Sequence, residues 1–268
     1  MMNVSYPLPS PNNGYAANAG ESANPSLWHK LGCAWVPALC QTGVLLRDYN
    51  RRFGPVTHNV PWTMQTPCGP VLHWANVSAQ TVTLPVLPLG STGTLVAMVR
   101  FTDFTTAGCL FRQIDSGPKL LDFGNYSSDA GAVYFGWYES GTNYRFTVTP
   151  AVLGISAGVF ASIAFTWNLA TTTQVVYVNG VPKGSKTDAL GVHTPATGPV
   201  LGDNTAGGSG EYEMQGDLAS LLWYDRVLSS NELQLLACDF MAPFRVRQPM
   251  RYVEASSRRR RLFYSGAA

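Results

Sequence analysis

The stretch GDLASLLWYDRVLS, residues 216–229, decides the fold. Its apolar run from Leu218 to Tyr224 predicts a strand, and helix signals begin as soon as this run ends. Ser229 and Glu232 have the spacing of a capping box, in which each side chain binds the backbone amide of the other residue. The segment therefore predicts a strand followed directly by one short helix.

The predicted helix is amphipathic. Its apolar side chains fall on one face at spacings of i, i+3, i+4 and i+7. They are Leu233, Leu236, Ala237 and Phe240. Pro243 is expected to end the helix. Beyond it, residues 245–268 show no periodicity and are interpreted as a tail.

Upstream, short runs of β-branched and aromatic residues recur about every 10–15 residues, separated by turn residues, as in an antiparallel sandwich. The clearest hairpin follows residues 173–178, because Asn179-Gly180 supplies a type I′ turn. Pro182 then places the second hairpin strand at a sheet edge. The predicted strands are 31–37, 44–46, 71–74, 81–84, 94–101, 109–114, 132–138, 144–149, 159–167 and 173–178.

Charge is scarce and unevenly placed. The 268 residues are only 13% charged, with a net charge of +2. Residues 240–268 hold seven arginines and one acid, Glu254, so this end is +6 and the rest is −4. Such a segment is either a solvated end or a docking element for an acidic protein surface, and nucleic acid is not an expected partner. The candidate docking residues are Arg245, Arg247, Arg251, Arg258, Arg259, Arg260, Arg261, Phe263 and Tyr264.

These signals divide the chain into an extended N-terminal arm (1–26), one domain (27–242) and an Arg-rich tail (243–268). The arm is either a disordered terminus or a strand that docks on a neighbour. Three of its prolines favour an extended, polyproline-like path: Pro7, Pro9 and Pro11. We expect no signal peptide and no membrane-spanning segment.

Several segments carry a family resemblance. They are residues 216–229 with Glu232-Leu233, the pair 164–167 and 176–180, residues 201–203 and, more loosely, 31–37, 45–48 and Trp74 with 81–84. Together they resemble laminin-G-like, concanavalin-A-like jelly rolls over about residues 27–242. The resemblance implies an all-β antiparallel sandwich with one short C-terminal helix and extended terminal arms.

The end of the chain resembles the ends of laminin-G-like proteins of tailed bacteriophages, since a helix, Pro243-Phe244 and an Arg-rich segment follow one another. This resemblance implies a non-enzymatic virion structural protein, such as a capsid decoration or a head- or tail-associated protein. We expect a homo-oligomer without a cofactor that docks on the major capsid protein or a neighbouring structural protein. Its expected location is the virion, assembled in the host cytoplasm.

Two other functions stay open. A carbohydrate-binding adhesin would use an exposed aromatic face formed by Tyr134, Trp137, Tyr138 and Tyr144, which also suits a protein interface. A retaining glycoside hydrolase needs two carboxylates about 5–5.5 Å apart. The nearest candidates are Glu211 and Glu213, with Asp217 further on, and we interpret the two glutamates as a solvated strand end.

Metal and thiol chemistry is not expected to be central. No histidine among His29, His58, His73 and His193 has an acid or cysteine at ligand spacing. The family resemblance makes calcium conceivable, with Asp203 and Asn204, or Asp122 and Asn125, as weak ligand candidates. The odd cysteine count and the lack of a CxxC pair predict buried free thiols in a reducing compartment. The cysteines are Cys33, Cys40, Cys68, Cys109 and Cys238.

Overall fold

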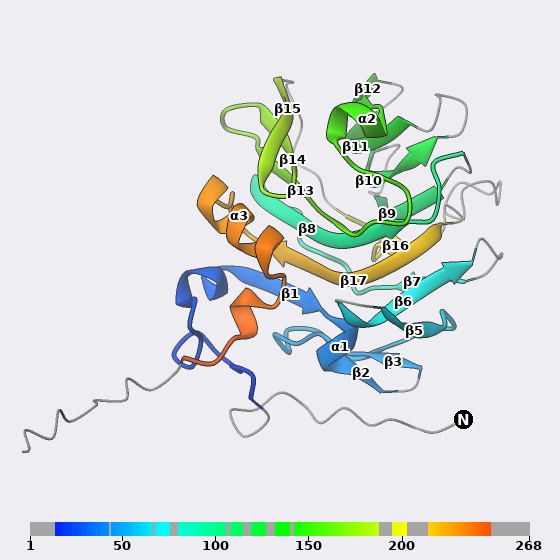
Figure 1. Cartoon of the computed structure of the whole chain (residues 1–268). Helices are drawn as coiled ribbons and strands as arrows, with labels where there is room; N and C mark the ends of the chain where they lie inside the picture. Colours follow the sequence, from blue (N-terminus) through cyan, green and yellow to red (C-terminus); the bar gives the residue numbers. More distant parts are fainter. Residues whose placement is uncertain are drawn as a thin grey trace, which may run out of the picture.

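The computed structural model describes residues 14–42, 44–65, 68–75, 80–105, 108–114, 119–126, 132–139, 142–187, 195–202 and 214–247. These residues form two large antiparallel sheets packed face to face and a small third sheet (Figure 1). The fold is therefore the all-β sandwich that the sequence predicts, with short helices attached.

The eight-stranded sheet runs in the order β15 (Val181–Thr187), β14 (Thr173–Val178), β13 (Ala161–Asn168), β8 (Thr92–Phe101), β17 (Gln215–Tyr224), β6 (Gly69–Ala75) and β5 (Trp62–Gln65), and β1 (Leu31–Trp35) also pairs with β17. The six-stranded sheet runs β12 (Thr142–Val148), β11 (Ala132–Glu139), β10 (Lys119–Tyr126), β9 (Gly108–Ile114), β16 (Val200–Leu201) and β7 (Val82–Thr83). The third contains β2 (Gln41–Thr42), β3 (Leu45–Leu46) and β4 (Val56–Thr57).

The main core fills the space between the two large sheets. Because side chains alternate along a strand, Trp167 of β13 and Trp223 of β17 face inward, with ring centroids 5.0 Å apart. Phe123 and Phe135 meet them from the six-stranded sheet and stack at 4.6 Å. Both sheets thus contribute large aromatic side chains to one continuous core.

The outer face of the eight-stranded sheet has a second apolar cluster. Here α3 (Ser230–Cys238) covers the sheet with Leu233 and Leu236, while the 3-10 helices η2 (Pro25–Trp28) and η5 (Ala242–Phe244) pack nearby. On this side Leu222 and Tyr224 of β17 are fully buried. The central strands are therefore buried on both faces.

The predicted helix and hairpin are confirmed. Ser229 and Glu232 form both bonds of the capping box, and α3 ends at Cys238, before Pro243. Asn179 and Gly180 have φ angles of 50° and 76°, as a type I′ turn requires. The strand after this turn, β15, forms the edge of its sheet.

Every predicted strand overlaps an observed one, with ends within two residues. The prediction missed the short strands β2, β4 and β5 and the longer β10. The sequence of β10, KLLDFGNY, mixes apolar residues with Lys, Asp, Gly and Asn, which disfavour strands. Its pairing with both β9 and β11 overrides that local preference. The prediction of a single helix also missed two one-turn helices, α1 (Pro37–Cys40) and α2 (Pro150–Leu153).

Candidate functional site

The two ends of the described chain pair with each other. Tyr15 bridges Arg245, and Ser22 bridges Val246, in antiparallel fashion. Ala16 donates its amide to the Phe244 carbonyl at 2.8 Å. Figure 1 shows the blue N-terminal segment beside the orange C-terminal one. Residues placed outside the domain by the sequence analysis therefore lie together on its outer face.

These contacts are partly buried. The side chain of Ser22 is fully buried and donates to the Pro243 carbonyl at 2.7 Å. Trp28 Nε1 donates to the same carbonyl at 2.6 Å. The Phe244 ring lies against Tyr49 and Trp28, with centroids at 4.4 and 6.0 Å. The inner part of each terminal segment is thus held by its own domain.

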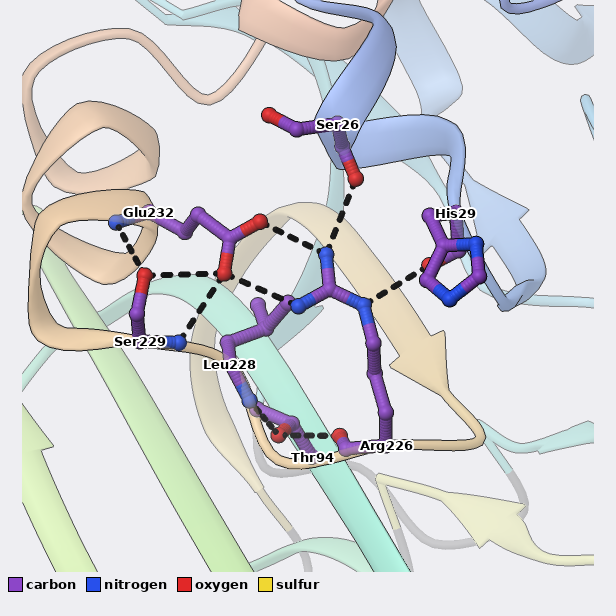
Figure 2. A network of polar contacts seen from close by, with 7 residues as sticks. All are labelled: Ser26, His29, Thr94, Arg226, Leu228, Ser229 and Glu232. Carbon is purple, nitrogen blue, oxygen red and sulfur yellow. Dashed lines mark hydrogen bonds and ion pairs between the residues drawn. The ribbon is translucent and has the colours of Figure 1, made fainter.

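Arg226, which follows β17, binds both the N-terminal segment and α3 (Figure 2). Its guanidinium donates to the carbonyls of Ser26 and His29 at 2.9 and 2.8 Å. It also donates to both carboxylate oxygens of Glu232, at 2.7 and 2.8 Å. Thr94 fixes the adjoining turn, since its hydroxyl donates to the Arg226 carbonyl. One guanidinium therefore joins three parts of the chain.

This ion pair shifts the proton equilibrium of Glu232. Hydrogen bonds from the Arg226 guanidinium, the largest cause, lower the pKa of Glu232 from 4.5 to about 2. The Ser229 amide and hydroxyl act in the same direction. The pKa of Arg226 is raised in turn by its hydrogen bonds to Glu232. Both groups are therefore charged in the native state across the ordinary pH range.

We expect Glu232→Gln to lower the free energy of unfolding by about 1–2 kcal/mol at neutral pH. Because the native pKa lies below the unfolded one, the stabilisation is complete above 4.5 and is lost as the pH falls toward about 2. Urea denaturation between pH 7 and pH 2 measures this loss. The variant should lose less stability over that window than the natural chain, and an equal slope would contradict the assignment.

The predicted docking residues are described only in part. Arg245 is exposed and donates to Asp239 at 2.8 Å, and these hydrogen bonds raise its pKa. Arg247 is exposed, and its amide donates to the Glu21 carbonyl at 2.7 Å. The others lie outside the described residues: Arg251, Arg258, Arg259, Arg260, Arg261, Phe263 and Tyr264. Docking through them stays a prediction.

The expected aromatic face is wrong for Tyr134, which is fully buried. Its hydroxyl lies over Gly124 of the neighbouring strand, where a Cβ atom would come within 2.6 Å of it. Tyr134 is therefore not available to stack on a sugar. Trp137 and Tyr144 occupy opposite positions on β11 and β12, and Tyr138 follows on β11. The side chains of these three residues lie outside what the structure describes.

The candidate acids do not form a described pair. Glu211 and Glu213 lie outside the described residues. Asp217 is fully buried, and accepts hydrogen bonds from Arg100 Nε at 2.5 Å and His73 Nδ1 at 2.9 Å. His73 therefore has an acid partner that the sequence analysis did not find. The register of β6 and β17 places these two residues opposite each other, although 144 positions separate them in the chain.

Within the described ranges, no group of three or more His, Cys, Asp or Glu side chains could hold a metal ion. The calcium candidates Asp203 and Asn204 lie outside those ranges, and only the backbone of Asp122 and Asn125 is described. No helix in the described part of the chain is long and apolar enough to cross a membrane.

The described cysteine side chains are free thiols. Cys33, Cys68 and Cys109 are buried as expected, and burial raises the pKa of Cys68 to about 11. Cys238 is exposed, which corrects the prediction of burial for this residue. It is the last residue of α3, and no other described residue buries it.

A recess of about 300 Å³, lined by polar residues, lies between β4 and β7. No sequence pattern indicated this recess. Its lining consists of Thr57, His58, Asn59, Thr81 and Thr83. His58 is buried, with Nδ1 3.0 Å from the Val60 carbonyl, and burial lowers its pKa. Because a carbonyl oxygen only accepts, Nδ1 donates this hydrogen bond.

Comparison with solved structures finds a similar fold in several proteins of low sequence identity. Domain 4 of AbnA, an extracellular arabinanase from Geobacillus stearothermophilus solved with arabinotriose, aligns with a TM-score of 0.59 and 18% identity, over 78% of this chain and 98% of that one. The binding domain of Paraclostridial Mosquitocidal Protein 1 gives 0.60 and 14%, over 79% and 52%. Trypanosoma rangeli sialidase gives 0.56 and 15%, over 82% and 36%.

The chain thus spans about half of the mosquitocidal binding domain and about a third of the sialidase. Among curated proteins, no sequence matches it. The family model described as the concanavalin A-like lectin/glucanases superfamily matches residues 76–234, which is more than half of the chain. With the observed sandwich and its closing strand and helix, this match shows that the chain belongs to the concanavalin A-like lectin/glucanase superfamily.

Proposed function

We propose that this protein is a non-enzymatic structural component of a bacteriophage virion and that it docks through its terminal segments. The observation that carries the proposal is the pairing of Tyr15 with Arg245 and of Ser22 with Val246. Because the described chain begins and ends at one place on the domain, a single contact region can engage both ends. The sandwich then forms the exposed module.

The charge distribution supports a protein partner with an acidic surface. The C-terminal 29 residues are +6 and the rest of the chain is −4. A compact basic segment steers association and makes it sensitive to salt. We propose a neighbouring virion protein as the partner, in a homo-oligomeric arrangement assembled in the host cytoplasm, without a membrane or a cofactor.

Deleting residues 248–268 should reduce the copies of the protein per purified particle by at least about tenfold, because four of the six net positive charges at this end are lost. The deletion leaves Arg247 and its pairing with the N-terminal segment in place. Copy number is measured by quantitative mass spectrometry of particles grown with each variant.

A matched pair of variants separates charge from length. Replacing the four arginines 258–261 by glutamine should act like the deletion, whereas replacing them by lysine should preserve at least half of the copies. Full incorporation of the deleted chain would overturn docking through the tail. Absence of the natural chain from particles would overturn the virion role itself.

The second candidate function is carbohydrate binding. It is favoured by the alignment with almost the whole of an arabinanase domain that was solved with arabinotriose. The Thr-rich recess at Thr57 and Thr83 offers hydroxyl groups of the kind that bind sugars. Saturable binding of the isolated protein on a glycan array would favour this function over a purely structural one.

A further inference from the structure

An open groove of about 920 Å³ with a mixed, slightly more apolar than polar lining lies on the outer face of the eight-stranded sheet, between the end of α3 and the β5–β6 hairpin. Its main lining side chains are Tyr15, Met64, Met98, Phe160, Phe240 and Met241. The charged lining residues, Asp239 and Arg245, neutralise each other through their ion pair. Met64 is 69% exposed here. An exposed apolar surface of this kind is typical of a binding site.

We propose that the groove is the binding site for residues 1–13 of the same chain. Tyr15 itself lines the groove, and the amide of Ala16 is fixed to Phe244. The chain therefore enters the groove from its border. In a polyproline conformation, thirteen residues extend about 40 Å, which is enough to run along the groove.

The composition of residues 1–13, called the arm here, suits binding in this groove. Residues 1–13, MMNVSYPLPSPNN, contain no charged side chain and supply Met2, Val4, Tyr6 and Leu8 as apolar groups. Proline-rich segments bind in aromatic-lined grooves because their extended shape is largely preformed. Methionine side chains adapt to irregular partners. The groove offers aromatic and methionine side chains together.

Other occupants fit less well. The tail carries the arginines 258–261, and burying these in the groove would cost their hydration, because the acid in its lining, Asp239, is already paired with Arg245. An arm from a second copy would have to compete with the chain's own arm, which is tethered at the groove and has an effective concentration in about the millimolar range. The covalent attachment of the arm at the groove and its uncharged composition therefore both favour the chain's own arm as the occupant.

This assignment goes beyond the proposed virion role and does not depend on it. It narrows the docking proposed above from both terminal segments to the basic tail, because it places the N-terminal arm on its own domain. Experiments on the isolated protein test it, so a negative result would leave incorporation into particles unaffected.

Cys238 is a built-in reporter, because its thiol is exposed and lines the groove. We expect a water-soluble alkylating reagent to modify Cys238 about tenfold faster in a chain that begins at Gly14 than in the full chain, because access controls thiol reactivity. Peptide mapping assigns the label to Cys238. Adding the synthetic peptide 1–13 to the shortened chain should restore the slow rate.

Two controls make the result specific. Val152→Cys, on α2 and 63% exposed, provides a thiol outside the groove whose rate should be equal in both chains. Leu8→Asp should open the groove like the deletion, whereas Ser10→Asp adds the same charge at a polar position and should keep the slow rate.

The outcomes are decisive in both directions. Equal rates at Cys238 in the full and shortened chains would overturn the proposal. Slow labelling that becomes fast when the full chain is diluted about a thousandfold would show that a second copy supplies the arm, since only an intermolecular contact depends on concentration. Slow labelling at every concentration supports the chain's own arm.

Discussion

Asp217→Asn is expected to lower the free energy of unfolding by about 3 kcal/mol, the scale for breaking a buried ion pair by removing one partner. The carboxylate has no solvent exposure, and it binds Arg100 and His73 on the outer face of the sheet. The amide of the Asp217→Asn variant would leave the Arg100 guanidinium without its counter-charge, although the Arg100 side chain is only 23% exposed. Urea denaturation of the purified domain measures the change.

Two variants test the cause of this loss. The double variant Asp217→Leu with Arg100→Met replaces both charges by apolar groups and should recover most of the lost stability, because no charge is left unpaired. Asp225→Asn removes a carboxylate from the half-exposed pair with Arg52 and should cost less than about 1 kcal/mol. A loss for Asp225→Asn as large as that for Asp217→Asn would contradict the role given to burial.

The closing segment could be predicted because its signals are local. The capping box of Ser229 and Glu232, the apolar face of α3 and the turn at Asn179-Gly180 depend on residues a few positions apart. The structure adds what no local pattern contains. Glu232 completes the cap and also binds Arg226, which reaches back 200 positions to the Ser26 carbonyl.

The same reasoning explains the errors at the candidate sites. The alternation of β11 suggested one covered and one open face, yet Tyr134 is buried as fully as its neighbour Phe135. Alternation assigns residues to faces, but what covers each face depends on the other strands and loops. Likewise, the pairing of His73 with Asp217 follows from strand register, which is set by tertiary packing.

Gly202→Ala should lower the free energy of unfolding by about 3 kcal/mol, from left-handed backbone strain and overpacking together. Gly202 has a φ of 85°, and a Cβ atom there would overlap the Trp74 indole. The indole is held by a hydrogen bond from its Nε1 to the Gln80 carbonyl at 2.8 Å. The backbone is also fixed, since Gly202 donates to Leu110 and accepts from Met214. Moving either the Trp74 indole or the backbone of Gly202 would therefore break a hydrogen bond.

Gly158→Ala is the matched control, because Gly158 has a similar φ of 74° but no heavy atom within 4 Å of the added Cβ. It carries the same kind of backbone strain without the overlap and should cost only about 1 kcal/mol. Thermal and urea unfolding of both variants therefore separate backbone strain from steric overlap. Equal losses would mean that the Trp74 indole yields to the methyl group, and the close approach of β16 to Trp74 would then not be the reason for glycine at position 202.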